Sequence, residues 1–158
     1  MKKTFPTPAF ESLVEVSALV EAFENHTLPR ERWDHAAHLV VALWYLVNFP
    51  TEVATQEIRQ GIRAYNVAVG ITNTATSGYH ETRTLFWLRI LEYFLADTTE
   101  LLSINALANA LLAGPLADPN LPLLYYSQAH LLSAEARMRW VEPDLKTLPI
   151  LDQTPNHA

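Results

Sequence analysis

The sequence contains no cysteine, and glycine is scarce, with four in 158 residues. Without cysteine the chain has no disulfides, thiolate metal sites, iron–sulfur clusters or cysteine nucleophile. The absence fits a reducing compartment, and we expect a cytoplasmic protein. Phosphate-loop and dinucleotide-binding glycine patterns are missing too, and so is the Gly-x-Ser-x-Gly motif of a nucleophilic serine.

Basic residues and long apolar runs are also in short supply. Lysine and arginine number 11 against 17 aspartates and glutamates, which gives a formal net charge of −6. Nucleic-acid binding relies on clustered positive charge, so no nucleic-acid partner is expected. The longest apolar run, residues 39–47, is far shorter than the roughly 20 residues that cross a bilayer. Pro6 and Pro8 interrupt the region where a signal peptide would be apolar. We therefore expect a soluble protein without a membrane partner.

What the sequence does contain is helical periodicity. Apolar residues make up 49% of the chain, as in globular proteins, and no stretch alternates with the period of two that strands need. The pattern predicts helices at residues 9–25, 29–48, 52–69, 78–96, 99–113 and 133–140. Pro29 suits the first position of the second helix, while Thr51 and Ser77 suit the caps of the third and fourth. The second helix is apolar nearly all round after Ala36, which predicts a buried central helix, and Gly61 within the third predicts close packing there. We predict an all-α, single-domain bundle of five to six helices over residues 1–158, with a loosely packed C-terminal tail from about residue 141.

Three histidines are the most informative polar residues. His35 and His38 lie in the segment WDHAAH at residues 33–38, and this spacing places two side chains about 60° apart on a helix, within reach of one ion. His80 belongs to the predicted inward stripe of the fourth helix. Buried imidazoles need polar partners, and one divalent ion satisfies all three. The ligand types fit zinc, iron or manganese.

Carboxylates and a tyrosine extend this predicted centre. Glu24 is a candidate fourth metal ligand, although a solvated charge at the end of the first helix is the simpler interpretation. Asp34 is a candidate base or a carboxylate that orients a histidine, and Tyr79 a candidate donor to a developing oxyanion. Glu81 is a candidate general base, but a favourable charge in the first helical turn is its better-supported role. Tyr65 and Asn66 are polar groups that can line the same pocket.

A second polar cluster lies toward the C-terminus, around Arg137. An arginine beside tyrosines, here Tyr125 and Tyr126, can bind a carboxylate or a phosphate. The favoured interpretation is that Arg137 pairs with Glu135 or Glu142 and fixes the tail.

Several of these segments carry a resemblance. The segments TLP at 27–29, WDHAAHL at 33–39, GIRAYN at 61–66, SGYHET at 77–82 and WVEPDL at 140–145 resemble a family of small, uncharacterised bacterial (hypothetical) proteins. The likeness covers most of the chain. It implies one compact domain in which His35, His38 and His80 belong to a shared pattern, and it implies no substrate, metal or catalytic residue.

The leading hypothesis from the sequence is a metal-dependent enzyme, of hydrolase or oxygenase type, that acts on a small-molecule substrate at His35, His38 and His80. Two alternatives stay open. One is a metal-free module that binds a small polar or aromatic molecule in a pocket lined by these histidines. The other is a structural or interaction protein whose histidines are hydrogen-bonded in the core. The apolar first and fifth helices also permit a homodimer.

Overall fold

The computed structural model describes residues 10–148, and every regular element in this range is helical. The prediction of an all-α bundle is thereby confirmed. The α-helices are α1 (Leu13–Glu24), α2 (His35–Asn48), α3 (Thr51–Ala68), α4 (Glu81–Asp97), α5 (Ile104–Ala113), α6 (Gln128–Leu131) and α7 (Ala134–Met138). Short 3₁₀ helices lie in the connections: η1 (Arg30–Arg32), η2 (Pro115–Ala117) and η3 (Leu121–Leu124). Within the described part of the chain, no helix is both long and apolar enough to cross a membrane.

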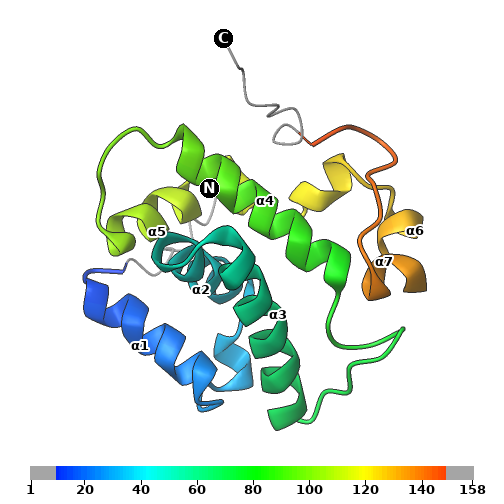
Figure 1. The fold of residues 1–158 in the computed structure, drawn as a ribbon, viewed down its shortest axis with the longest axis horizontal. Coiled ribbons are helices and arrows are strands. Elements are labelled where there is room, and N and C mark those ends of the chain that lie inside the picture. Colours follow the sequence, from blue (N-terminus) through cyan, green and yellow to red (C-terminus); the bar gives the residue numbers. More distant parts are fainter. Residues whose placement is uncertain (1–9, 149–158) are drawn as a thin grey trace, which may run out of the picture.

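Helix α2 is the centre of the main core. It contacts α1, α3, α4 and α5, and Figure 1 shows it among these longer helices. Its apolar side chains face in several directions, which is the pattern of a helix that is surrounded by protein. Val40 and Leu43 are fully buried, and Leu39 and Val41 nearly so. The sequence-based placement of this helix in the interior is confirmed.

Close packing of α1 on α3 depends on one glycine. A Cβ atom added at Gly61 would lie 2.8 Å from the ring of Phe23, which is too close for any larger residue without a shift. The helix therefore accepts the propensity cost of glycine so that a buried aromatic ring can sit against its backbone. The expectation of close packing at this position is confirmed.

The C-terminal part of the chain builds a second, smaller core on α4. Figure 1 shows α6 and α7 beside the N-terminal end of α4, with α5 toward the other end. Tyr126 and Leu148 are fully buried in this core and Val141 is nearly so. The hydroxyl group of Tyr126 donates to the carbonyl oxygen of Val141 over 2.8 Å. A loosely packed tail from about residue 141 is therefore wrong for residues 141–148, and residues 149–158 lie outside the described range.

The predicted start of α5 is also wrong, since the helix begins at Ile104 after its cap Ser103 and not at residue 99. Two further helix starts are wrong, and both of these errors change the positions of histidines. Helix α2 begins at His35 and not near Pro29, because the side chain of Asp34 caps it by accepting from the backbone N–H of Ala37 over 2.8 Å. Helix α4 begins at Glu81, and its N-cap is His80 rather than Ser77. The histidines consequently lie at helix starts, which face the same side of the bundle.

Candidate functional site

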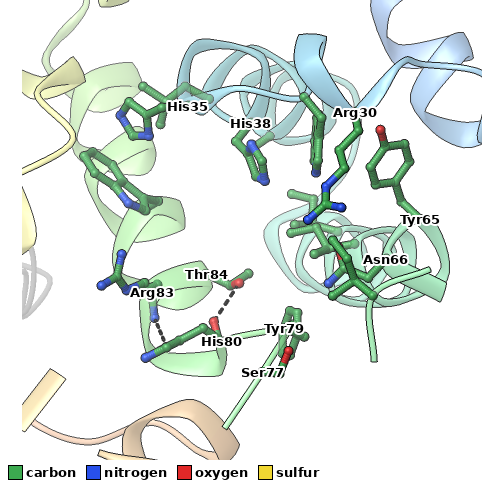
Figure 2. Close-up of a pocket in the computed structure, with 18 of the residues that line it drawn as sticks. Arg30, His35, His38, Tyr65, Asn66, Ser77, Tyr79, His80, Arg83 and Thr84 are labelled. Carbon is green, nitrogen blue, oxygen red and sulfur yellow. Dashed lines mark hydrogen bonds between the residues drawn. The ribbon is translucent and has the colours of Figure 1, made fainter. Parts of the chain in front are cut away.

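A pocket of about 930 Å³, which we call the central pocket, lies between α2, α3 and the first turns of α4. The 3₁₀ helix η1 and the loop between α3 and α4 complete its walls. This volume falls in the range of sites that hold small organic molecules. Its polar lining side chains, most of which Figure 2 labels, are Arg30, His35, His38, Tyr65, Asn66, Thr72, Ser77, Tyr79, His80, Arg83 and Thr84. The sequence-based expectation that Tyr65, Asn66 and Tyr79 line the histidine pocket is confirmed.

The α2 wall carries His35 and His38, and backbone carbonyl groups fix the proton position on each ring. Nδ1 of His38 lies 2.7 Å from the carbonyl oxygen of Asp34, and Nε2 of His35 lies 3.0 Å from that of Ala117. A carbonyl oxygen only accepts hydrogen bonds, so the ring nitrogen facing it must carry the proton. In the neutral rings, Nε2 of His38 and Nδ1 of His35 are therefore acceptors.

The surroundings keep both rings neutral. Burial lowers the pKa of His38 to about 4, and the neighbouring His35 lowers it further, against the opposing effect of the Asp34 carbonyl and carboxylate. Burial likewise lowers the pKa of His35. The ring of His38 stacks on Trp33 with centroids 3.7 Å apart, and His35 meets Trp87 edge-on at 4.8 Å. Each imidazole is thus held in one orientation by an indole and a carbonyl.

His80 lies on the opposite wall of the central pocket, and both its nitrogen atoms are occupied. Nδ1 accepts from the backbone N–H of Arg83 over 3.1 Å, and Nε2 donates to the carbonyl oxygen of Leu131 over 2.9 Å. Burial lowers its pKa, and the positive charges of Arg83 and Arg137 add to this effect. Figure 2 shows His80 well apart from His35 and His38, with its ring beside the α4 backbone. Its role is to cap α4 and tie the C-terminal segment to it.

This arrangement does not assemble the predicted metal centre. The three histidines do line one pocket, but they face it from two walls, and His80 has no free lone pair. Among residues 10–148, no group of three or more histidine, aspartate or glutamate side chains is placed to hold an ion. The physical reason is the N-cap position of His80, which turns Nδ1 onto its own helix rather than toward α2.

The predicted fourth ligand, Glu24, lies elsewhere. It accepts a hydrogen bond from the hydroxyl group of Tyr45 and lines a separate hollow of about 420 Å³ with Phe49 and Glu57. The structure therefore does not bring Glu24 to the histidines. Its exposed position agrees with the simpler interpretation as a charge at the end of α1.

The three candidate catalytic residues already have structural partners. Asp34 caps α2. The buried carboxylate of Glu81 lies 2.6 Å from the guanidinium group of Arg59, and it also accepts from the hydroxyl group of Tyr79 over 3.1 Å. Burial raises the pKa of Tyr79 to about 12, as does Glu81. Of the three, only Tyr79 lines the central pocket. Glu81 influences the pocket indirectly, because its hydrogen bond positions the Tyr79 ring.

Two arginines that sequence reasoning missed also line the central pocket, Arg30 from η1 and Arg83 from the first turn of α4. They enter from opposite sides (Figure 2). Arg83 stands one helical turn after His80, which was the signal available in the sequence. Burial lowers the pKa of Arg83, and the nearby positive charge of Arg137 lowers it further.

Arg137 does not pair with Glu135 or Glu142, as the favoured interpretation held. It donates to the carbonyl oxygen of Gly78 over 2.7 Å, while Arg139 takes Glu135 as its partner. The physical reason is the spacing: Glu135 and Arg137 are two residues apart on α7 and do not face each other, whereas Arg139 is four residues from Glu135.

That loop closes one side of the pocket, and Asn73 holds it. The side-chain Nδ2 of Asn73 donates to the carbonyl oxygen of Arg63 over 3.1 Å. Its Oδ1 accepts from the side chain of Asn66 and from the backbone N–H of Tyr79, both over 3.0 Å. Asn73 thus fastens the loop to α3, as does the backbone N–H of Ile71, which donates to the carbonyl oxygen of Asn66 over 2.8 Å.

Comparisons with protein-family models, with curated proteins and with solved structures found no match for this chain.

Proposed function

We propose that the protein binds a small organic molecule in the central pocket, and that no metal ion joins the histidines when it does so. This is the metal-free alternative left open by the sequence. The observation that carries it is the state of His38, whose Nε2 has no partner among the described residues although the ring is fixed by Trp33 and by the Asp34 carbonyl. An oriented, unpaired acceptor in a pocket is the kind of group that fixes a ligand.

The rest of the pocket supports an organic ligand. The buried side chains Leu39, Ala42, Ile58 and Leu88 provide an apolar floor, and the polar groups stand around it. Burying apolar surface contributes about 25 cal/mol per Å², so a hydrocarbon body on this floor supplies binding energy that an ion or a sugar does not. The polar groups then select the orientation.

The hypothesis of a metal-dependent enzyme has less support from the geometry. It needs three imidazole nitrogens that converge, whereas His80 uses both of its own in hydrogen bonds. It also needs a free base, while Asp34 and Glu81 are engaged in a cap and an ion pair. The cytoplasmic location and the homodimer remain predictions from the sequence.

Calorimetric titration with 2-naphthol tests the proposal, since this uncharged molecule combines an apolar body with one hydroxyl donor. We expect saturable 1:1 binding that a pocket-filling variant, Ile62→Trp, reduces at least about tenfold. Val67→Trp is the matched control, because Val67 lies exposed on the same helix outside the pocket. Absence of saturable binding, or equal binding by both variants, would favour the structural or interaction protein and overturn the proposal.

A further inference from the structure

The charge of the central pocket is opposite to that of the chain. The formal net charge is −6, yet no aspartate or glutamate lines the pocket, while two arginines do. Among the described residues neither Arg30 nor Arg83 forms an ion pair, in contrast to Arg59 and Arg139. A chain rich in carboxylates has therefore placed none of them beside these two guanidinium groups.

The two arginines stand at the mouth of the pocket rather than on its floor. Both residues are exposed, whereas the floor residue Leu39 is buried. Figure 2 shows Arg30 directed into the space beside His38 and Asn66, and Arg83 on the other side near Thr84. A charged group of a ligand would meet one or both arginines at the rim, and the uncharged remainder would reach the floor.

A third cation strengthens this positive region. Arg137 is held by the carbonyl oxygen of Gly78, and it is close enough to Arg83 to disfavour the charge of that residue. Neighbouring positive charges of this kind favour a bound anion. Burial lowers the pKa of His80, and the charges of Arg83 and Arg137 lower it further.

His38 adds a second, independent requirement. Its Nδ1–H group is used by the Asp34 carbonyl, so the ring offers Nε2 to the pocket as a lone pair. A bare carboxylate oxygen would be repelled there, since both atoms are acceptors. The atom that faces His38 must therefore carry a hydrogen, as a hydroxyl or an N–H group does.

We propose that the ligand of the central pocket is a small amphipathic carboxylate, which rests on the proposed function. Its carboxylate binds one of the two arginines, Arg30 or Arg83, at the mouth, its apolar body covers the floor, and a hydroxyl or N–H group donates to Nε2 of His38. Guanidinium groups match carboxylates in geometry as well as in charge.

Four compounds that each contain a naphthalene body test the negative charge and the hydrogen-bond donor separately. They are 6-hydroxy-2-naphthoate, 6-methoxy-2-naphthoate and the methyl ester of each. The acids carry the charge and the esters do not, while the hydroxyl compounds have a donor that the methoxy compounds lack. By calorimetry we expect each acid to bind at least about tenfold more tightly than its ester, and each hydroxyl compound about threefold to tenfold more tightly than its methoxy partner.

Three variants assign each preference to its residue. Of Arg30→Gln and Arg83→Gln, the one that removes the arginine bound to the carboxylate should reduce the acid-to-ester ratio about threefold or more, and the double variant should bring it close to one. Arg32→Gln is the matched control, since Arg32 belongs to η1 but does not line the pocket. His38→Phe keeps a ring against Trp33 and should remove only the preference for the hydroxyl compounds.

The outcomes of the two proposals are distinct. If the esters bind as tightly as the acids, the pocket exists but the anion proposal is overturned. The same conclusion follows if the acid-to-ester ratio survives in the double arginine variant. If none of the four compounds binds the wild-type protein saturably, the proposed function itself is overturned.

Discussion

The indole ring of Trp33 lies between two other rings, with the imidazole of His38 stacked on it at 3.7 Å and the ring of Phe23 stacked at 4.6 Å. Phe23 is buried in the main core, while His38 lines the central pocket. The three stacked rings therefore connect the main core to the wall of the central pocket. A ring packed in this way has few orientations, so the core determines where Nε2 of His38 points.

The lowered pKa of His38 makes stability depend on pH. The pKa of His38 is about 4 in the folded protein against 6.5 for the unperturbed group. Between these values the unfolded chain binds more protons than the folded one, so the free energy of unfolding falls as the pH drops from about 6.5 to 4. At about 1.4 kcal/mol per pKa unit, His38 accounts for at most about 3 kcal/mol of this loss.

Urea unfolding of the His38→Phe variant between pH 7.5 and 4 tests this prediction. The variant has no proton to gain at position 38, so its stability should fall less steeply than that of the wild type. The groups that face His38 are His35 and Asp34, and both are retained. Parallel slopes for His38→Phe and the wild type would contradict the assignment.

Removal of metal ions should change little. With both nitrogens of His80 in hydrogen bonds, an ion beside His35 and His38 would lack the third imidazole ligand. We expect EDTA treatment to leave the melting temperature within about 1 °C and the affinity for 2-naphthol unchanged. Elemental analysis of untagged protein should find no stoichiometric zinc, iron or manganese. Stoichiometric metal that is lost in His35→Ala would instead restore the metal-dependent enzyme.

The fold was the part of the structure that could be predicted from the sequence. Periodicity identified all five long helices, since an apolar stripe must be buried whatever its exact partners are. The interior position of α2 and the close approach at Gly61 followed from the same pattern. Helix starts were harder, because a cap depends on which side chain reaches a free N–H group. An imidazole as N-cap of α4 is uncommon, and composition gave no reason to choose His80 over Ser77.

The candidate site was less predictable from the sequence than the fold. The sequence predicted one shared centre for His35, His38 and His80, and the three residues line one pocket, but from two walls. It had no access to the carbonyl groups of Ala117 and Leu131, which belong to segments far along the chain. Those two carbonyl groups determine which imidazole nitrogens are free. The number of free nitrogens is what distinguishes a metal centre from a pocket for an organic molecule.

Loss of the Glu81 carboxylate should be costly to stability. Its side chain is 10% exposed and that of Arg59 27%, so Glu81→Gln leaves a partly buried guanidinium without its counter-charge. We expect a loss of about 2 to 3 kcal/mol in the free energy of unfolding. Glu135→Gln breaks the pair with Arg139, where the exposures are 57% and 72%, and should cost less than about 1 kcal/mol. Equal losses measured by urea unfolding would show that burial of the first pair has no energetic weight.

The loop over the pocket offers a comparison between two glycines. Gly70 and Gly78 both have positive φ, +85° and +76°, but their surroundings differ. A Cβ atom at Gly70 meets nothing within 4 Å, whereas at Gly78 it would lie 2.6 Å from the Oδ1 atom of Asn73 and from the backbone oxygen of Thr72. Gly70→Ala should therefore cost only the backbone strain, about 1 kcal/mol. Gly78→Ala adds a clash that must displace Asn73, and we expect a loss of at least about 2 to 3 kcal/mol.

The same substitution should reach the ligand site. Displacing Asn73 breaks its bond to the N–H group of Tyr79, so the pocket wall loses one of its attachments to α3. We expect Gly78→Ala to weaken binding of 6-hydroxy-2-naphthoate in calorimetry, while Gly70→Ala binds as the wild type does. If Gly78→Ala is destabilised but binds with unchanged affinity, the loop is a structural connection and the ligand contacts lie on the helices alone.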